Sequence, residues 1–148
     1  METIYEVVRI KQVIQEVETP FLEKKISGPD MAKEMARHFI GDEDREVFLV
    51  MCLNTKNQVT AVHRCHVGSI NASIVHPREV YKACILNNSA SILVAHNHPS
   101  QDCHPSTEDG QVTKRLVEAG KILGIEVLDH IIVNATGGCY SFRESGRM

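Results

Sequence analysis

Residues 91–109 read SILVAHNHPSQDCHPSTED, an apolar run that leads directly into two histidines and then into the start of a helix. Side chains at positions i and i+2 of an extended segment point to the same side, so His96 and His98 can present two imidazoles to one point. Asp109 falls in the first turn of the predicted helix, from where it can supply a carboxylate. Two histidines and one carboxylate, with a fourth position left to water, are typical of a catalytic zinc site. The segment therefore predicts zinc bound by His96, His98 and Asp109.

Several residues of this segment also have interpretations that do not involve binding a metal. Ser106 and Asp109 have the spacing of a helix N-cap and the acidic residue of a capping box. Cys103 and His104 lie between the two ligand segments, and each is either a plain loop residue or a fourth ligand that would displace the water. Ser106 is also a candidate hydrogen-bond donor to an oxyanion, a role worth roughly 3 kcal/mol where it has been measured.

The chain around this segment alternates predicted strands and helices. A segment rich in β-branched residues at 4–17 is expected to be extended, and a helix is expected to begin at Pro29 and to end at Gly41. Strands are predicted at 45–54, 59–67, 91–95, 125–133 and 139–142, and further helices at 77–86 and 106–123. Hairpins combined with crossovers predict an α/β fold, a mixed β-sheet flanked by helices.

Composition narrows the class of protein. The chain has 148 residues, which predicts a single domain, and its formal net charge of −3 lacks the basic excess of a dedicated nucleic-acid binder. Its longest apolar run, residues 47–53, is too short to cross a membrane. The five cysteines show no C-x-x-C spacing, and the first residues lack the features of a secretory signal. We therefore expect a cytoplasmic protein that does not bind membranes.

The pattern His-x-His, seven residues, Ser, two residues, Asp is met without a gap by His96, His98, Ser106 and Asp109. With residues 75–80 (VHPREV) and 95–100 (AHNHPS), it resembles the RadC-like branch of the JAMM (MPN-type) metalloproteases. The resemblance implies a cytidine-deaminase-like fold over residues 28–148. Residues 1–27, which precede this domain, are expected to form an N-terminal extended segment. The resemblance implies a zinc ion on the three ligands and a zinc-bound water as nucleophile. It also implies a general base at Glu46, for which an acidic surface turn is the competing interpretation.

These observations favour a zinc metallopeptidase or isopeptidase that hydrolyses an amide bond in a peptide or protein. Asn97 stands where deubiquitinase-type members usually carry Ser or Thr, which argues against ubiquitin-like substrates. One alternative is a DNA-repair-associated nuclease or accessory protein, although fuller family members carry a DNA-associated module for which the residues before Pro29 are too few. A second alternative is a non-catalytic binding module of the same fold. A zinc nucleobase deaminase is excluded, because neither H-x-E nor P-C-x-x-C occurs.

Overall fold

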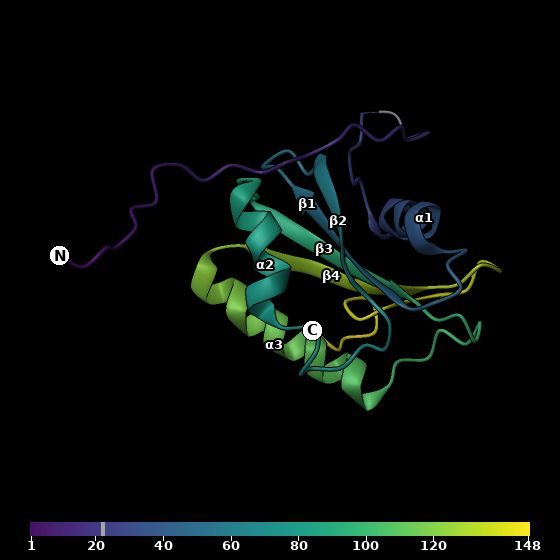
Figure 1. Cartoon of the computed structure of the whole chain (residues 1–148). Helices are drawn as coiled ribbons and strands as arrows, with labels where there is room; N and C mark the ends of the chain where they lie inside the picture. The colour runs from purple at the N-terminus through teal and green to yellow at the C-terminus, as the bar shows by residue number, and fades with distance from the viewer. Residues whose placement is uncertain (22) are drawn as a thin grey trace.

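The computed structural model, which describes residues 1–21 and 23–148, contains one mixed sheet with helices on both faces (Figure 1). The strands lie in the order β2-β1-β3-β4-β5. The elements in chain order are α1 (Pro29–Ile40), β1 (Val47–Leu53), β2 (Val59–Val67), α2 (Pro77–Leu86), β3 (Ser91–Asn97), α3 (Thr107–Leu123), β4 (Glu126–Val133) and β5 (Cys139–Ser141). The α/β fold with a mixed sheet, predicted from the order of elements, is confirmed.

The sheet combines a hairpin with a crossover. β1 pairs antiparallel with both β2 and β3, whereas β3 and β4 are parallel and are connected through α3. β5 pairs antiparallel with β4. Every residue of β1 and of β3 is buried, as expected for strands covered on both faces. β3 is thus the middle strand, and its last residues lie where α3 begins its return across the sheet.

Two apolar cores follow from the alternation of side chains along the strands. One core packs the inner faces of α2 and α3 against one side of the sheet, and it includes Phe48, Val50, Val80, Tyr81, Ile92, Val94, Val112 and Leu116. The other core packs α1 against the opposite side, and it includes Met35, Ile40, Leu49, Met51, Leu93, Ala95, Ile131 and Val133. The molecule therefore has three layers, with the sheet in the middle (Figure 1).

The packing of three segments differs from what their local sequence pattern favours. The segment at 4–17 forms no strand; it crosses the C-terminal end of α2, where Gln12 Nε2 donates to the carbonyl of Ala83 at 3.0 Å, and its apolar side chains are exposed. Met31, Met35 and Phe39 recur at i, i+4 and i+8 in α1, but only Met35 is fully buried; Phe39 packs against the same core, and the other buried residues of α1 are Ala32, Ala36 and Ile40. In α3 the apolar residues Val112, Leu116, Ala119 and Leu123 recur at helical spacing, but of these Leu123 is exposed. No helix in the described residues has the length and apolarity to cross a bilayer.

At Gly120, α3 packs closely against Tyr81 and the carbonyl of Ile125. A Cβ atom there would lie 2.6 Å from the Tyr81 hydroxyl and would also collide with the carbonyl of Ile125. That hydroxyl donates to the carbonyl of Leu116 at 2.6 Å, so Tyr81 cannot move aside without losing a buried hydrogen bond.

We expect Gly120→Ala to lower the free energy of unfolding by about 1–3 kcal/mol through overpacking, measured by chemical denaturation. Gly110→Ala in the same helix is the matched control, because its Cβ would meet only the flexible end of Arg147 at 3.2 Å. The control should be neutral or more stable by up to about 1 kcal/mol, since alanine has the higher helix propensity. Equal destabilisation by both variants would contradict the close packing at Gly120.

Candidate metal centre

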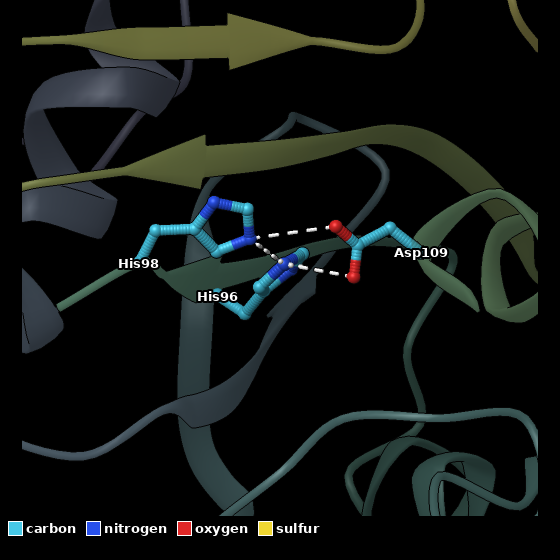
Figure 2. A group of neighbouring side chains, drawn as sticks. All are labelled: His96, His98 and Asp109. Carbon is cyan, nitrogen blue, oxygen red and sulfur yellow. Dashed lines mark hydrogen bonds and ion pairs between the residues drawn. The ribbon is translucent and has the colours of Figure 1, made fainter. Parts of the chain in front are cut away.

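The alternation of β3 places the two histidines on the α3 side of the sheet. Ile92 and Val94 contribute to the core beneath α2 and α3, and His96 continues the same row. His98 follows one residue beyond the strand and again points this way. Asp109 lies in the first turn of α3, and its side chain faces the end of β3 (Figure 2). Strand period and helix start thus bring the three predicted ligands together.

The three side chains converge with the spacing of metal ligands (Figure 2). His96 Nε2 lies 3.0 Å from His98 Nε2 and 3.2 Å from Asp109 Oδ1, and His98 Nε2 lies 3.4 Å from Asp109 Oδ2. Ligands at zinc distances around a tetrahedron lie about 3.3 Å from one another. The two contacts to Asp109 use different carboxylate oxygens, and one ligand atom from each of the three residues lies within 4.8 Å of the others, close enough to hold one metal ion.

Asp109 combines the capping box with the contact to the histidines. Ser106 Oγ accepts from the backbone N–H of Asp109 at 3.0 Å, and the N–H of Ser106 donates to Asp109 Oδ2 at 2.9 Å. The capping interpretation and the ligand position are therefore both realised by one residue, and the cap orients the carboxylate. Burial raises the pKa of Asp109, but hydrogen bonds from His96 and His98 outweigh it and hold that pKa well below its usual value. The carboxylate is ionised.

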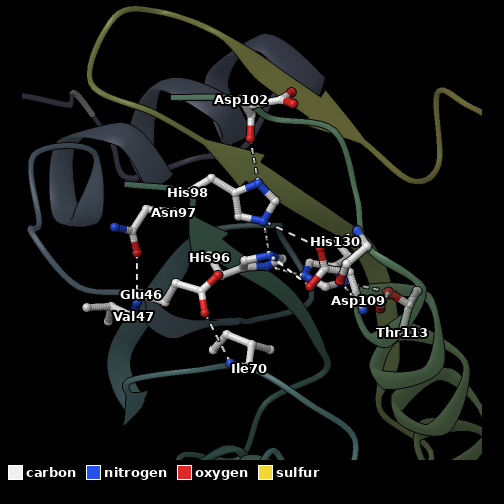
Figure 3. A network of polar contacts seen from close by, with 11 residues as sticks. Glu46, Val47, Ile70, His96, Asn97, His98, Asp102, Asp109, Thr113 and His130 are labelled. Carbon is white, nitrogen blue, oxygen red and sulfur yellow. Dashed lines mark hydrogen bonds and ion pairs between the residues drawn. The ribbon is translucent and has the colours of Figure 1, made fainter. Parts of the chain in front are cut away.

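The orientation of His98 is set by the loop that follows it. His98 Nδ1 donates to the carbonyl oxygen of Asp102 at 2.6 Å, which leaves Nε2 directed at Asp109 (Figure 3). A carbonyl cannot donate, so this contact requires a proton on Nδ1 and a lone pair or a second proton on Nε2. The hydrogen bond to Asp109 raises the pKa of His98, against the opposing effect of burial. This is the support usually found around metal-ligating histidines.

Glu46 and Ser106 line the same pocket as His98 and Asp109. The pocket has a volume of about 350 Å³ and is also lined by Ile70, Pro99, Ser100, Asp102 and His104. Glu46 precedes β1 and is half-buried, and its Oε2 accepts the backbone N–H of Ile70 at 3.1 Å (Figure 3). Both predicted catalytic side chains therefore border the space in front of the ligands, and their roles stay predictions.

Cys103 and His104 lie outside the group of converging ligands. That group contains only His96, His98 and Asp109 among the described residues. His104 borders the pocket, whereas Cys103 does not. Burial raises the pKa of the Cys103 thiol. The arrangement thus favours Cys103 as a loop residue and leaves space in front of the ligands.

Asn97 was not predicted to belong to the site, yet it holds the segment that carries Glu46. It points to the opposite side of β3 from its two histidine neighbours and has 1% of its surface exposed. Its Oδ1 accepts from Val47 N–H at 2.7 Å (Figure 3). Its Nδ2 donates to the carbonyls of Glu43 and Arg45 at 3.2 and 2.9 Å. These three hydrogen bonds fix the backbone on both sides of Glu46.

His130 and Thr113 were also missed from sequence. His130 Nε2 lies 2.8 Å from His96 Nδ1, and His130 Nδ1 lies 2.5 Å from Thr113 Oγ1 (Figure 3). His130 is fully buried, and this burial lowers the pKa of its imidazole well below the usual value, so the ring is neutral. The available signal was a histidine inside the predicted strand 125–133, which the structure places beside β3.

Comparison with known proteins agrees with this geometry. A sequence profile of the RadC-like JAB domain family matches residues 26–147. The chain belongs to this family. It is 48% identical over 120 residues to a UPF0758 protein of Alkaliphilus oremlandii, a match that covers 81% of this chain and 51% of that relative. UPF0758 proteins of Shouchella clausii and Methanosarcina barkeri are 49% and 44% identical over 130 residues, covering 87% and 88% of this chain and 56% of each relative.

The chain spans about half the length of these curated relatives. The resemblance to the RadC-like family, inferred from the spacing of the histidines and the aspartate, is confirmed over residues 26–147 of this chain.

We expect Asn97→Ala to loosen the Glu46 segment. The variant leaves the buried N–H of Val47 and two carbonyls without their partner, and it should lose at least about 2 kcal/mol of unfolding free energy. Amide hydrogen exchange should rise at Gly68 and Ile70, whose N–H groups bond to the backbone and side chain of Glu46.

Asn54→Ala is the matched control. Asn54 also makes three side-chain hydrogen bonds, but in the β1–β2 turn away from the site. Its loss should destabilise the protein without selectively raising exchange at Gly68 and Ile70. A selective increase in hydrogen exchange at these two amides in both variants would contradict a specific role of Asn97 in fixing the Glu46 segment.

Proposed function

We propose that this RadC-like JAB domain is a zinc-dependent hydrolase that cleaves an amide bond in a peptide or protein substrate. The observation that carries the proposal is the convergence of His96, His98 and Asp109: the two Nε2 atoms lie 3.0 Å apart, and they lie 3.2 and 3.4 Å from the two carboxylate oxygens of Asp109, separations that a tetrahedral zinc ion can accommodate. Three protein ligands leave a fourth position for water or substrate, as in catalytic rather than structural zinc sites.

A zinc ion held here would polarise a substrate carbonyl and lower the pKa of a coordinated water to about 7. Glu46 would accept a proton from the attacking water and pass it to the leaving amine, which typically contributes about 10²–10⁴-fold. The N–H of Ile70 holds Oε2 of Glu46, so the carboxylate has a fixed direction while Oε1 is left for the proton. The protein thus supplies an oriented base at the edge of the pocket.

Ser106 can serve both the helix and the substrate. Its Oγ accepts the N–H of Asp109, so its own hydroxyl proton is free to be donated. Ser106 is exposed and borders the pocket, where a developing oxyanion would lie. Such a donor strengthens binding of the transition state without taking part in proton transfer.

A peptide substrate suits this site better than a nucleic acid. The pocket is lined by Glu46, Asp102 and Asp109 and by no lysine or arginine. Phosphate groups are normally bound by basic side chains, and a net charge of −3 adds no general attraction. The presence of all three ligands and of Glu46 also favours a hydrolase over a binding module that has lost its chemistry.

Metal content tests the ligand assignment. We expect the purified protein to contain about one zinc ion per chain and His96→Ala to lose it. Zinc content is measured by elemental (inductively coupled plasma) mass spectrometry. His63→Ala on the exposed side of β2 is the control and should keep the metal. Equal zinc in wild type and His96→Ala would refute the assignment.

Substitution of Glu46 tests the hydrolytic role. Glu46→Gln should keep its zinc while hydrolysis of a peptide or isopeptide library falls by about 10²–10⁴-fold, because the amide cannot accept the proton. Glu43→Gln is the matched control, since Glu43 pairs with Arg64 outside the pocket. A zinc-loaded wild type that cleaves DNA but no peptide, or no substrate at all, would favour the nuclease or the binding module.

A further inference from the structure

We propose that Arg115 is a positioning residue for Glu46 and acts through the loop that joins β2 to α2. This loop covers residues 68–75 and contains neither strand nor helix. The inference rests on the role proposed for Glu46 as the general base. Arg115 itself does not line the pocket, so any influence it has on the reaction passes through the residues that it holds.

Two contacts connect Glu46 to this loop. The backbone N–H of Gly68 donates to the carbonyl of Glu46 at 2.7 Å and continues the ladder between β1 and β2. The backbone N–H of Ile70 donates to Glu46 Oε2 at 3.1 Å (Figure 3). The first contact holds the main chain, and the second sets the direction of the carboxylate. The position of the Ile70 N–H therefore decides where Glu46 points.

The loop is shaped by its own turn and by apolar packing. Asn71 Oδ1 accepts from the N–H groups of Ser73 and Ile74, both at 3.0 Å, so the turn is closed by its own residues. Ile70 and Val75 bury their side chains in the core beneath α2 and α3. Apolar packing is not directional, so it attaches the loop to the core without fixing the direction of its N–H and carbonyl groups.

Arg115 supplies a directional contact between the loop and α3. Its Nη1 donates to the carbonyl of Ala72, the second residue after Ile70. Arg115 is half-buried and forms no ion pair among the residues that the structure describes. A hydrogen bond from a charged donor is roughly twice as strong as a neutral one. This bond therefore fixes the carbonyl of Ala72 and, through two residues of chain, the N–H of Ile70.

One helix thus carries both a predicted metal ligand and the residue that holds the loop of the base. Asp109 lies in the first turn of α3, and Arg115 lies about 1.7 turns further along the same helix. A helix of this length is rigid, so the separation of these two positions is fixed. The placement of Glu46 relative to the ligands is therefore set by α3, although Glu46 lies on a different segment of the chain.

Amide hydrogen exchange of the purified full chain is the first test. Arg115→Met keeps an apolar stem but cannot donate, and we expect exchange at the Ile70 N–H to rise by about 10-fold or more, as for the loss of a charged hydrogen bond. Exchange at Gly68 should stay as in wild type, because the β1–β2 ladder holds that amide. Arg115→Lys retains a charged donor on a shorter stem and should recover part of the protection.

Lys114→Met is the matched control, because Lys114 is the neighbouring basic residue of α3 and is exposed. It should leave exchange at both amides unchanged. Thermal unfolding identifies any variant that does not fold.

Catalysis is the second test. Arg115→Met should lower kcat by about 10-fold, a part of the roughly 10²–10⁴-fold that a general base contributes, with zinc content and KM unchanged. In the Glu46→Gln background the same substitution should cause no further loss of activity, since the residue through which Arg115 acts is already removed.

Wild-type exchange at Ile70 in folded Arg115→Met would overturn the inference. A full additional loss of activity in the Glu46→Gln background would overturn it as well, because Arg115 would then act independently of Glu46. If the wild-type protein hydrolyses no amide, the proposed function fails, whereas the exchange measurements still decide whether Arg115 holds the Ile70 N–H.

Discussion

Asp109 and His96 meet at 3.2 Å with almost no exposed surface, and an ionised carboxylate in such a place costs several kcal/mol unless partners compensate for it. The compensation comes from the backbone N–H of Ser106 and from two imidazoles. Each of these partners requires a particular position of a strand end or a helix start. The need to pair one buried charge therefore ties the N-terminus of α3 to the end of β3, and the architecture of the parallel crossover supplies that geometry.

Local patterns were sufficient for most elements and for the three ligands. The uninterrupted apolar run beginning at Val47, the proline at the start of α2 and the cap at Ser106 depend on neighbours in sequence, and the strands and helices formed there. The spacing of His96, His98 and Asp109 likewise needs only one strand end and one helix turn. For that reason the ligand group could be predicted before any tertiary contact was known.

The errors and omissions involve contacts between distant segments. The β-branched residues at 4–17 favour an extended chain, but no neighbouring strand edge accepts them, so they form no strand. The rotation of α1 depends on the sheet beneath it. His130 and Asn97 act through β4 and through the segment before β1, and their partners are set by strand register, which the local pattern does not specify.

The ligands and their supporting residues all fall within residues 91–133, a single strand-helix-strand unit, whereas Glu46 itself lies outside that unit, before β1, and its side chain accepts from the N–H of Ile70. The residues that would bind a metal ion and the residue that would use it in catalysis thus lie in separate parts of the chain. Substitutions could remove catalysis and leave metal binding intact. Evolution could accordingly convert such a domain from a hydrolase into a metal-dependent recognition module, or back again, by changes confined to the segment around residue 46.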